Sequence, residues 1–522
     1  MITRLHVTGV RRALRGALAG LLAAAVALGV AELAAGLTGP LSSPVVAVGG
    51  TAIDLTPVSV KDFAIAHFGS DDKTALEAGI LLLLAVFAAL IGALAMRWLA
   101  VGLAGLAAFG ALGIGAALTR PSAGPADAFP SLAGVIAAAA VLTWLISTAR
   151  RPSQATPRRP APQQETAAPA RRGFLAMAAG AAVVAAASGS AGDLLLGRFS
   201  AVAARARVRL PRASVPASPV PAGADLKISG LTPFFTTDSS FYRVDTDLIV
   251  PQVSPEQWTL QITGMVDREI ELTFAELLKL PLVEHDMTLV CVSNQVGGPY
   301  AGNARWLGVS LPALLRRAGV ARGADQVLST STDGMTISTP VDVIMDGRQA
   351  LIAVGMNGQP LPLQHGFPAR MLVPGLYGYV SATKWVTRLE LTTFGRRRAY
   401  WTQRGYAAQA PIKTESRIDV PRPLARLKAG PVTVAGVAWA PHRGISAVEV
   451  NVDNGPWRTA TLAASDGHDT WRQWTWAWDP APGLHTLQAR ATDGTGATQT
   501  PERAGVFPSG ATGWDSVVVT VT

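Results

Sequence analysis

Apolar residues form long runs along the first 200 residues and short, often alternating runs along the rest of the chain. Each long run approaches the roughly 20 residues that a helix needs to cross a bilayer, so the pattern predicts transmembrane helices. Small residues, mostly Ala and Gly, are frequent in these runs and suit close helix packing in lipid. The five predicted spans are Gly16–Leu37, Leu76–Met96, Leu99–Leu118, Leu132–Ser147 and Gly173–Leu196.

The arginines predict an orientation for these spans. Four precede the first span (Arg4, Arg11, Arg12 and Arg15), and six lie in the Pro- and Ala-rich stretch 149–172, which we expect to be an unstructured linker. Positive residues gather on the cytoplasmic side, so both stretches should be cytoplasmic and everything after residue 196 should lie outside. Five more arginines follow the fifth span, so charge is nearly balanced across it. The helices are interpreted as an anchor, and a quinone- or partner-binding role stays open.

Residues 225–410 have the mixed pattern of an α+β domain. Thr273 and Glu276 form a capping box that opens a short helix, and Ser310 caps a second helix, Leu311–Ala318. Between them lie short runs rich in apolar and β-branched residues. The predicted strands are Trp258–Met265, Gln326–Thr330, Thr336–Pro340, Leu351–Met356, Arg370–Val373 and Lys384–Leu391.

Residues 411–522 show turn signals about every ten residues between strand-like runs. That spacing predicts an all-β sandwich of about seven strands. The runs are Val432–Trp439, Ile445–Val452, Thr459–Leu462, Gln473–Trp478, Gly483–Ala491 and Ser516–Val521.

Composition agrees with this multi-domain organisation of a membrane bundle and two further domains. The chain has 522 residues, of which 49% are hydrophobic and only 15% charged. The net charge of +10 sits largely in arginine-rich linkers beside apolar runs. With neither a basic helix nor an aromatic stacking platform, a nucleic-acid partner is excluded.

The stretch around Cys291, the chain's single cysteine, is the strongest chemical signal. Thr288–Val292 is predicted to be a buried strand, and the loop Ser293–Asn303 follows with three glycines. One cysteine alone cannot form an intrachain disulfide, an iron–sulfur cluster, a structural zinc site or a c-type haem attachment. It can be a buried small hydrophobe, a catalytic nucleophile or a single thiolate ligand. The nucleophile reading lacks a clear base, because His285 lies six residues upstream.

Four segments resemble the sulfite oxidase family, in the family's order. Leu289–Asn294 with Asn303–Val309 looks like its molybdenum-binding segment, and His365–Gly375 like its pterin-binding motif. Ser381–Trp385 matches the stretch that closes on the pterin phosphate, and Phe241–Thr246 resembles the family's access loop. The resemblance implies a mostly β, α+β molybdopterin domain that carries Mo-molybdopterin.

The resemblance also implies roles for individual residues. Cys291 would bind the metal, which fits the preference of soft metals for thiolate, and Arg370 and Lys384 would hold phosphate. In the family a His or Asn at the position of His365 hydrogen-bonds the cofactor, so His365 is expected to contact the cofactor rather than the metal. Arg243 and Arg305 are candidates for a substrate oxyanion, although Arg305 can equally pack on Trp306. The remaining candidate cofactor contacts are Ser240, Tyr242, Val244, Thr330, Ser381, Ala382 and Thr383.

Two of these expectations have ordinary alternatives. Thr330 belongs to Ser329–Gly334, which resembles another cofactor-contacting segment or is a simple Asp-Gly turn. The backbone amides of Ser381 to Thr383 are expected to add a small anion-binding concavity.

Export and assembly are also implied by resemblance. Arg171–Leu175 with the apolar run after it looks like a twin-arginine export signal, or else is ordinary positive-inside charge. Strands in residues 434–493 resemble the immunoglobulin-like dimerisation domain of the family, so a homodimer is expected to be accessible. The predicted division is 1–148 (four spans), 149–172 (linker), 173–196 (fifth span), 197–224 (linker), 225–410 (molybdopterin domain) and 411–522 (immunoglobulin-like domain).

The predicted function is an extracytoplasmic, multi-pass membrane oxidoreductase that transfers an oxygen atom to a small oxyanion such as sulfite. The alternative on the same scaffold is reduction of a sulfoxide or N-oxide. No haem, flavin or iron–sulfur motif is visible, so a separate electron carrier, a cytochrome or a quinone-linked protein, is expected. A different class, a non-enzymatic membrane receptor with an immunoglobulin-like tip, stays open at this point.

Overall fold

The computed structural model describes residues 2–68, 72–120, 123–150 and 169–522, in two compact units. Unit 1 comprises residues 1–200 with the short segment 246–249, and unit 2 comprises residues 201–245 and 250–522. The linker predicted at 149–172 falls largely on residues 151–168, which lie outside the described residues.

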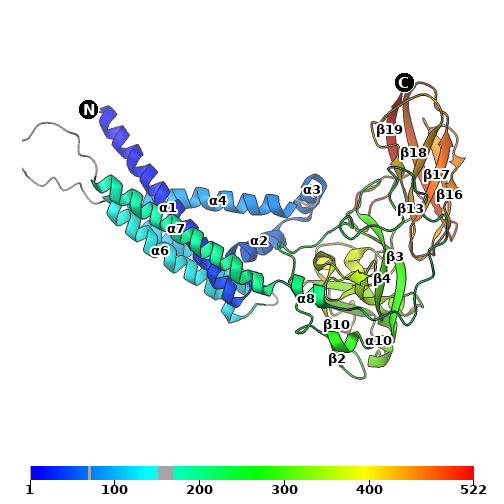
Figure 1. The fold of residues 1–522 in the computed structure, drawn as a ribbon, viewed down its shortest axis with the longest axis horizontal. Coiled ribbons are helices and arrows are strands. Elements are labelled where there is room, and N and C mark those ends of the chain that lie inside the picture. The colour runs from blue at the N-terminus through cyan, green and yellow to red at the C-terminus, as the bar shows by residue number, and fades with distance from the viewer. Residues whose placement is uncertain (1, 69–71, 121–122, 151–168) are drawn as a thin grey trace, which may run out of the picture. The chain divides into compact units, whose positions relative to one another are not determined.

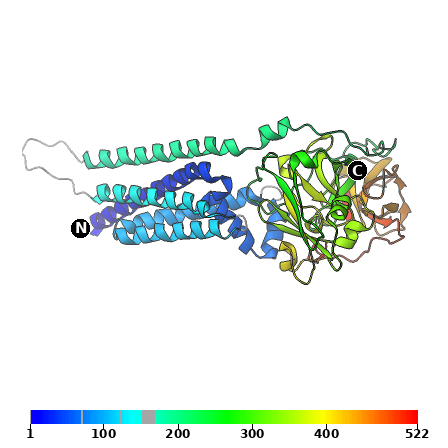
Figure 2. The same cartoon turned by 90° about the horizontal axis from the view of Figure 1, so that it is seen from below.

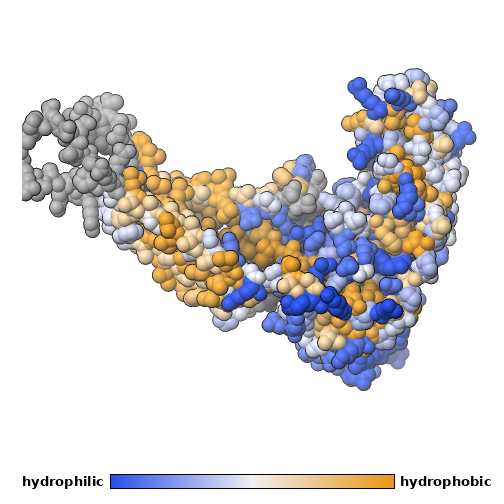
Figure 3. Space-filling model, viewed as in Figure 1, coloured by the Kyte–Doolittle hydropathy of each residue, from blue (hydrophilic) through white to orange (hydrophobic). Residues whose placement is uncertain are grey.

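Unit 1 is helical (Figures 1 and 2). Five of its helices are long and apolar enough to cross a membrane, judged by length and composition over the described residues. Each overlaps one of the five predicted spans, and apolar side chains cover much of the bundle surface (Figure 3). Helices α2 and α3 were not predicted, because both are too short to span a membrane. The helices are α1 (Ile2–Thr38), α2 (Pro44–Leu55), α3 (Val58–Phe68), α4 (Asp72–Ala95), α5 (Leu99–Leu118), α6 (Phe129–Arg150) and α7 (Pro169–Leu196).

Glycines let these helices approach closely, as the abundance of small residues predicted. A Cβ built on Gly20 of α1 would lie 1.9 Å from the carbonyl oxygen of Ala88 on α4. A Cβ on Gly92 of α4 would lie 2.1 Å from the carbonyl oxygen of Gly16. Any larger residue at these positions would therefore push the two backbones apart.

Residues 201–410 of unit 2 contain two sheets. One has the strand order β2-β1-β10-β5-β6, and the other has the order β3-β4-β7-β8 with β9 also paired to β7. The strands are β1 (Thr259–Gly264), β2 (Ile270–Thr273), β3 (Leu282–Val290), β4 (Ala301–Ser310), β5 (Gln326–Ser331), β6 (Thr336–Pro340), β7 (Leu351–Met356), β8 (Gln359–Pro360), β9 (Arg370–Leu372) and β10 (Val386–Thr392).

Short helices join these strands. Thr273 and Glu276 form the predicted capping box at α9, and the Ser310 hydroxyl accepts the Ala313 N–H at the start of α10. A difference from the sequence prediction is α8, which lies within the stretch 197–224 expected to be a linker. Arg205 of α8 donates to the carbonyls of Pro360 and Leu361, so this stretch is partly built into unit 2. The helices are α8 (Val202–Arg207), α9 (Phe274–Leu277), α10 (Leu311–Ala318), α11 (Val341–Met345) and α12 (Tyr400–Gln403), with 3₁₀ turns η5 (Leu363–His365) and η6 (Gly378–Val380).

Residues 411–522 form two further sheets, ordered β11-β13-β17-β16 and β12-β19-β18-β14-β15. Val434 and Trp474 from the first sheet share one buried core with Val448 and Leu487 from the second. Five of the six predicted runs are strands within two residues at each end, whereas Thr459–Leu462 is divided between β15 and β16, which belong to different sheets. The strands are β11 (Glu415–Val420), β12 (Arg426–Leu427), β13 (Val432–Trp439), β14 (Ile445–Val452), β15 (Arg458–Thr459), β16 (Thr461–Leu462), β17 (Arg472–Trp478), β18 (Gly483–Asp493) and β19 (Asp515–Val521).

The segment 469–471 of this C-terminal part contacts strand β3 directly. The Thr288 N–H donates to the Asp469 carbonyl (2.9 Å), and the Trp471 N–H donates to the Thr288 hydroxyl (2.7 Å). The Trp471 indole donates to the Phe234 carbonyl (2.8 Å), and His285 lies 2.8 Å from the Asp469 carboxylate. The outer edge of β3 is therefore hydrogen-bonded by residues from far along the chain.

Candidate active site

Cys291 lies directly after β3, where the chain turns. Its N–H donates to the Tyr300 carbonyl (2.9 Å), which extends the pairing of β3 with β4 by one residue. The Asn294 N–H then donates to the Cys291 carbonyl (3.0 Å) and closes a tight turn. The Ser293 N–H lies 3.4 Å from Sγ, within hydrogen-bonding distance of the sulfur. The residue is half-buried, so it is not sealed in the core.

Tyr242 lies close to this sulfur and to Arg370. Burial and then the Cys291 charge raise the pKa of the Tyr242 phenol above its usual range, while the Arg370 charge opposes them. A Cβ built on Gly378 would lie 3.9 Å from the phenol oxygen and 3.8 Å from the Val290 carbonyl. The phenol therefore stays protonated, as a hydrogen-bond donor beside the end of β3.

Arg370, on β9, is buried with one unused donor. Its side chain sits 5.2 Å above the Trp306 ring, and Nη1 donates to the His365 carbonyl (3.1 Å). Its Nε has no hydrogen-bond partner among the described residues. Burial lowers the pKa of Arg370 to about 10, so the guanidinium is still charged at neutral pH. An unmatched buried donor on a cation is costly unless an anion accepts from it, which fits a phosphate-bearing cofactor.

His365 is buried and neutral. Its Nε2 lies 3.0 Å from the Asp238 carbonyl, so Nε2 carries the proton and Nδ1 is left as an acceptor. Burial lowers the pKa of His365 to about 4, and the charges of Arg370, Lys384 and Arg243 contribute. All three cations thus lie within electrostatic range of one ring, so segments 241–246, 365–375 and 381–385 meet in space.

Asp245 joins two of these cations. Its Oδ2 lies 2.7 Å from Lys384 Nζ and 2.8 Å from Arg243 Nε, and its side chain is only 4% exposed. The Arg243 side chain remains 34% exposed. Together with Arg370, three cations surround one carboxylate and a neutral histidine, so the site carries excess positive charge and suits anions.

Gly366 explains how these segments fit together. It has a φ of +107°, and a Cβ there would lie 3.1 Å from both Arg370 Cβ and Lys384 Cα. Glycine both adopts this left-handed backbone and leaves room for the two cationic segments to touch.

The polar residues 381–383 are used mainly within the protein. The Ser381 hydroxyl donates to the carbonyls of Leu376 and Tyr377, and the Thr383 hydroxyl pairs with that of Ser329 (2.5 Å). The N–H groups of Ser381 and Ala382 donate to the Gly378 carbonyl. Two of the three backbone N–H groups expected to bind an anion therefore already donate to a carbonyl within the protein.

The other candidates lie in varied settings. Thr330 is half-buried in β5, where its carbonyl accepts from the Thr387 hydroxyl. The Asp-Gly turn of its segment follows the strand, and the Gly334 N–H donates to the Ser331 carbonyl there. Ser240 is exposed and Val244 half-buried in the loop before Asp245.

Arg305 is committed to a different partner. Its Nε and Nη2 donate to the two carboxylate oxygens of Asp286 (2.8 and 2.7 Å), its cross-strand neighbour on β3. Asp286 is four residues before Val290, or roughly 13 Å along the strand from its end. This bidentate pair does not favour the predicted catalytic role, because the guanidinium is neutralised at a distance from Cys291.

Glu415 and Tyr377 were missed by sequence reasoning. The Glu415 carboxyl, 3% exposed, lies beside the amide of Asn294 in the Cys291 turn, and burial raises the pKa of Glu415 to about 8. Tyr377 lies within electrostatic range of both Glu415 and Cys291, and burial raises the pKa of its phenol. Glu415 opens β11, 124 residues after the cysteine, and no local pattern connects the two.

Comparison with known proteins identifies this architecture. Residues 247–401 match the model of the oxidoreductase molybdopterin binding domain. These residues are a molybdopterin-binding oxidoreductase domain of the sulfite oxidase family. The chain is similar to the mitochondrial sulfite oxidases of Drosophila melanogaster (30% identity over 311 residues, 50% of this chain and 53% of the relative) and Mus musculus (28% over 292 residues, 48% and 52%). It thus spans about half the length of these sulfite oxidases.

A solved structure also matches. The sulfane dehydrogenase SoxCD from Paracoccus pantotrophus superimposes with a TM-score of 0.49 at 23% identity, over 56% of this chain and 84% of that one. The sequence-based expectation of a sulfite-oxidase-family oxidoreductase is confirmed by the domain match and the sulfite oxidase relatives, and the receptor alternative is set aside.

Proposed function

We propose that this protein is a membrane-anchored, extracytoplasmic oxidoreductase that holds Mo-molybdopterin at Cys291 and oxidises a small oxyanion of the sulfite class. The observation that carries the proposal is the convergence of Cys291, Tyr242, Arg370 and His365 at the end of β3, with excess positive charge around them. When bound, the cofactor supplies the redox chemistry and the oxygen-atom transfer.

Each side chain has a role in this proposal. The Cys291 thiolate is the protein's sulfur ligand, and the unmatched Nε of Arg370 donates to an anionic oxygen of the cofactor. Neutral His365 offers Nδ1 as an acceptor and Tyr242 offers a phenolic donor, so the two orient neighbouring polar groups. Arg243, the most exposed of the three cations, is the candidate for attracting substrate. Lys384 would contribute a point charge to the phosphate.

The expected anchoring and orientation belong to the same proposal. The five long apolar helices would hold the protein in the cell membrane, with a twin-arginine-type signal at Arg171–Arg172 and unit 2 outside. Residues 411–522 would be an immunoglobulin-like sandwich that allows a homodimer, and electrons would pass to a separate carrier. The two sheets with one shared core support the sandwich.

Metal analysis and a redox-dye assay test the enzymatic part. The full chain, purified in detergent, is expected to contain about one molybdenum and one pterin per protein and to reduce dye with sulfite. Sulfoxides and N-oxides are tested as electron acceptors for the reverse direction. Cys291→Ser should lose the metal while keeping its fold, seen as an unchanged far-ultraviolet circular dichroism spectrum. A molybdenum-loaded Cys291→Ser protein with full activity would overturn the proposal.

Impermeant thiol labelling tests the orientation. In a Cys291→Ser background, Ser465→Cys reports on the exposed surface of unit 2 and Ser153→Cys on the predicted cytoplasmic linker. In intact cells only the first should be labelled, and both should be labelled after lysis. Labelling of Ser153→Cys alone in intact cells would reverse the orientation.

A further inference from the structure

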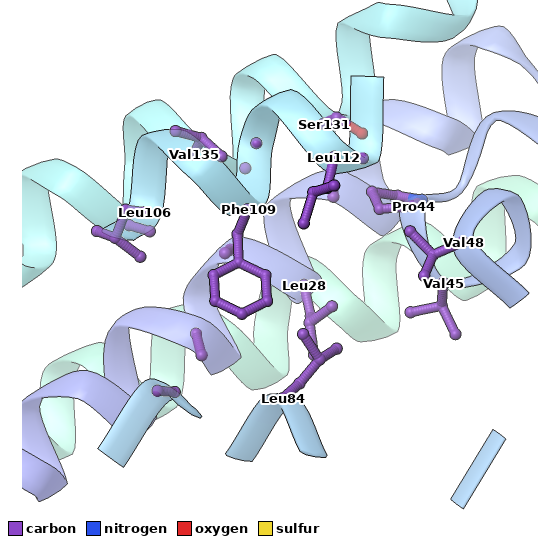
Figure 4. Close-up of a pocket in the computed structure, with 18 of the residues that line it drawn as sticks. Leu28, Pro44, Val45, Val48, Leu84, Leu106, Phe109, Leu112, Ser131 and Val135 are labelled. Carbon is purple, nitrogen blue, oxygen red and sulfur yellow. The ribbon is translucent and has the colours of Figure 1, made fainter. Parts of the chain in front are cut away.

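Unit 1 contains a partly open cavity of about 200 Å³ between helices α1, α2, α4, α5 and α6 (Figure 4). Its walls include Leu28, Leu84, Leu106 and Val135, and the ring of Phe109 provides a flat aromatic face. A cavity of 150 Å³ already holds benzene, so this one has room for a substituted six-membered ring.

Ser131 gives the cavity a single polar point. It is the only polar side chain among the described residues that line the cavity, and it is 4% exposed. Its hydroxyl has no hydrogen-bond partner within the described part of the chain. A Cβ built on Gly113 would lie 2.9 Å from the Ser131 oxygen, so glycine there keeps the space beside the hydroxyl clear. An unmatched buried hydroxyl costs stability unless a ligand accepts from it.

These features define the chemistry of an occupant. The walls are apolar, so the bulk of the ligand must be hydrophobic. Among the described wall residues none is charged, so a charged head group, such as that of a phospholipid, would be buried without a partner. The one donor requires an acceptor such as a carbonyl oxygen, and Phe109 suits a flat ring.

We propose that this cavity binds a neutral, carbonyl-bearing ring with an apolar tail, of the prenylquinone class, and that Ser131 donates to one carbonyl. The binding itself does not depend on the function proposed for unit 2. Only the corollary, that such a quinone is the electron carrier, rests on that proposed function.

Binding is measured with the full chain in phospholipid nanodiscs and a radiolabelled, decyl-substituted para-benzoquinone, above the uptake of protein-free nanodiscs. Ala24→Leu places a larger side chain in the cavity wall and should weaken binding at least tenfold. Ala25→Leu, the same change on the exposed side of α1, is the matched control and should bind like the parent protein.

Ser131→Ala tests the hydrogen bond. It should weaken quinone binding about fivefold, the usual effect of one hydrogen bond, and leave binding of carbonyl-free decylbenzene unchanged. This variant decides the matter even if Ala24→Leu fails to fold. Equal quinone binding by Ser131→Ala and the parent, or a cavity occupied by phospholipid that the quinone does not displace, would overturn the proposal. Cys291→Ser should still bind the quinone, which separates this result from any failure of the function proposed for unit 2.

Discussion

Glu415 should make unit 2 less stable as the pH rises. In the folded protein burial raises the pKa of its carboxyl to about 8, whereas an unfolded chain has a value near 4.5. Between these values the folded state holds a proton that the unfolded state has released. The free energy of unfolding must then fall by about 1.4 kcal/mol per pH unit across this window, or about 5 kcal/mol in all.

Glu415→Gln removes this dependence, because an amide of the same shape stays neutral. The variant should match the parent near pH 5 and be more stable by about 3 kcal/mol at pH 7 and about 5 kcal/mol at pH 9. Denaturant unfolding of the full chain in detergent, followed by tryptophan fluorescence, measures this difference in the free energy of unfolding. Of the 13 tryptophans, only Trp98 and Trp144 lie in unit 1, so the signal reports on unit 2.

Glu271→Gln, at an exposed glutamate of β2, is the matched control and should follow the parent at every pH. The reasoning is refuted if the stability of Glu415→Gln declines with pH in parallel with the parent protein, because the buried carboxyl would then ionise normally in the folded state.

Three further outcomes are expected. Because the pKa of His365 is lowered to about 4, the unfolded chain takes up a proton first as the pH falls. This group alone lowers stability by about 3 kcal/mol between pH 6.5 and 4, whereas Glu415 raises stability by a similar amount over that range. In a Glu415→Gln background, acid unfolding curves should therefore show the drop, His365→Asn should abolish it, and its persistence would contradict the assignment. Gly302→Ala puts a Cβ 2.8 Å from the Phe241 ring and should cost about 1–3 kcal/mol in denaturant unfolding, whereas Gly467→Ala, in open space, should cost little. Gly20→Leu should loosen the contact of α1 with α4, seen as faster proteolysis of the bundle in detergent, and unchanged cleavage would argue against this crossing.

Local patterns predicted much of the fold. The capping box at Thr273, the cap at Ser310 and most strands of residues 432–521 depend on neighbours in sequence, so local patterns predicted them. The run Thr459–Leu462 was predicted as one strand but is two, because its residues pair in different sheets. The turn at Cys291 was also predicted, although its strand ends one residue before the cysteine instead of one residue after it.

Partners across the fold could not be predicted. Asp286 lies opposite Arg305 because β3 and β4 pair in one particular register, and the sequence does not state that register. Asp245 was read only as part of the access loop, yet it bridges Arg243 to a lysine 139 residues away. Helix α8 was assigned to a linker because its six residues carry too short a pattern, and its stability comes from contacts with residues 360–361.

The hydrogen bonds between segment 469–471 and β3 limit where this chain can be truncated. A chain cut after residue 410 would lose Asp469 and Trp471. The Thr288 N–H, the Phe234 carbonyl and the His285 ring would then each lose a hydrogen-bond partner. The half of β3 nearest the cysteine would then present a bare edge, the kind of surface on which proteins aggregate. The two β-rich parts should therefore be expressed as one piece.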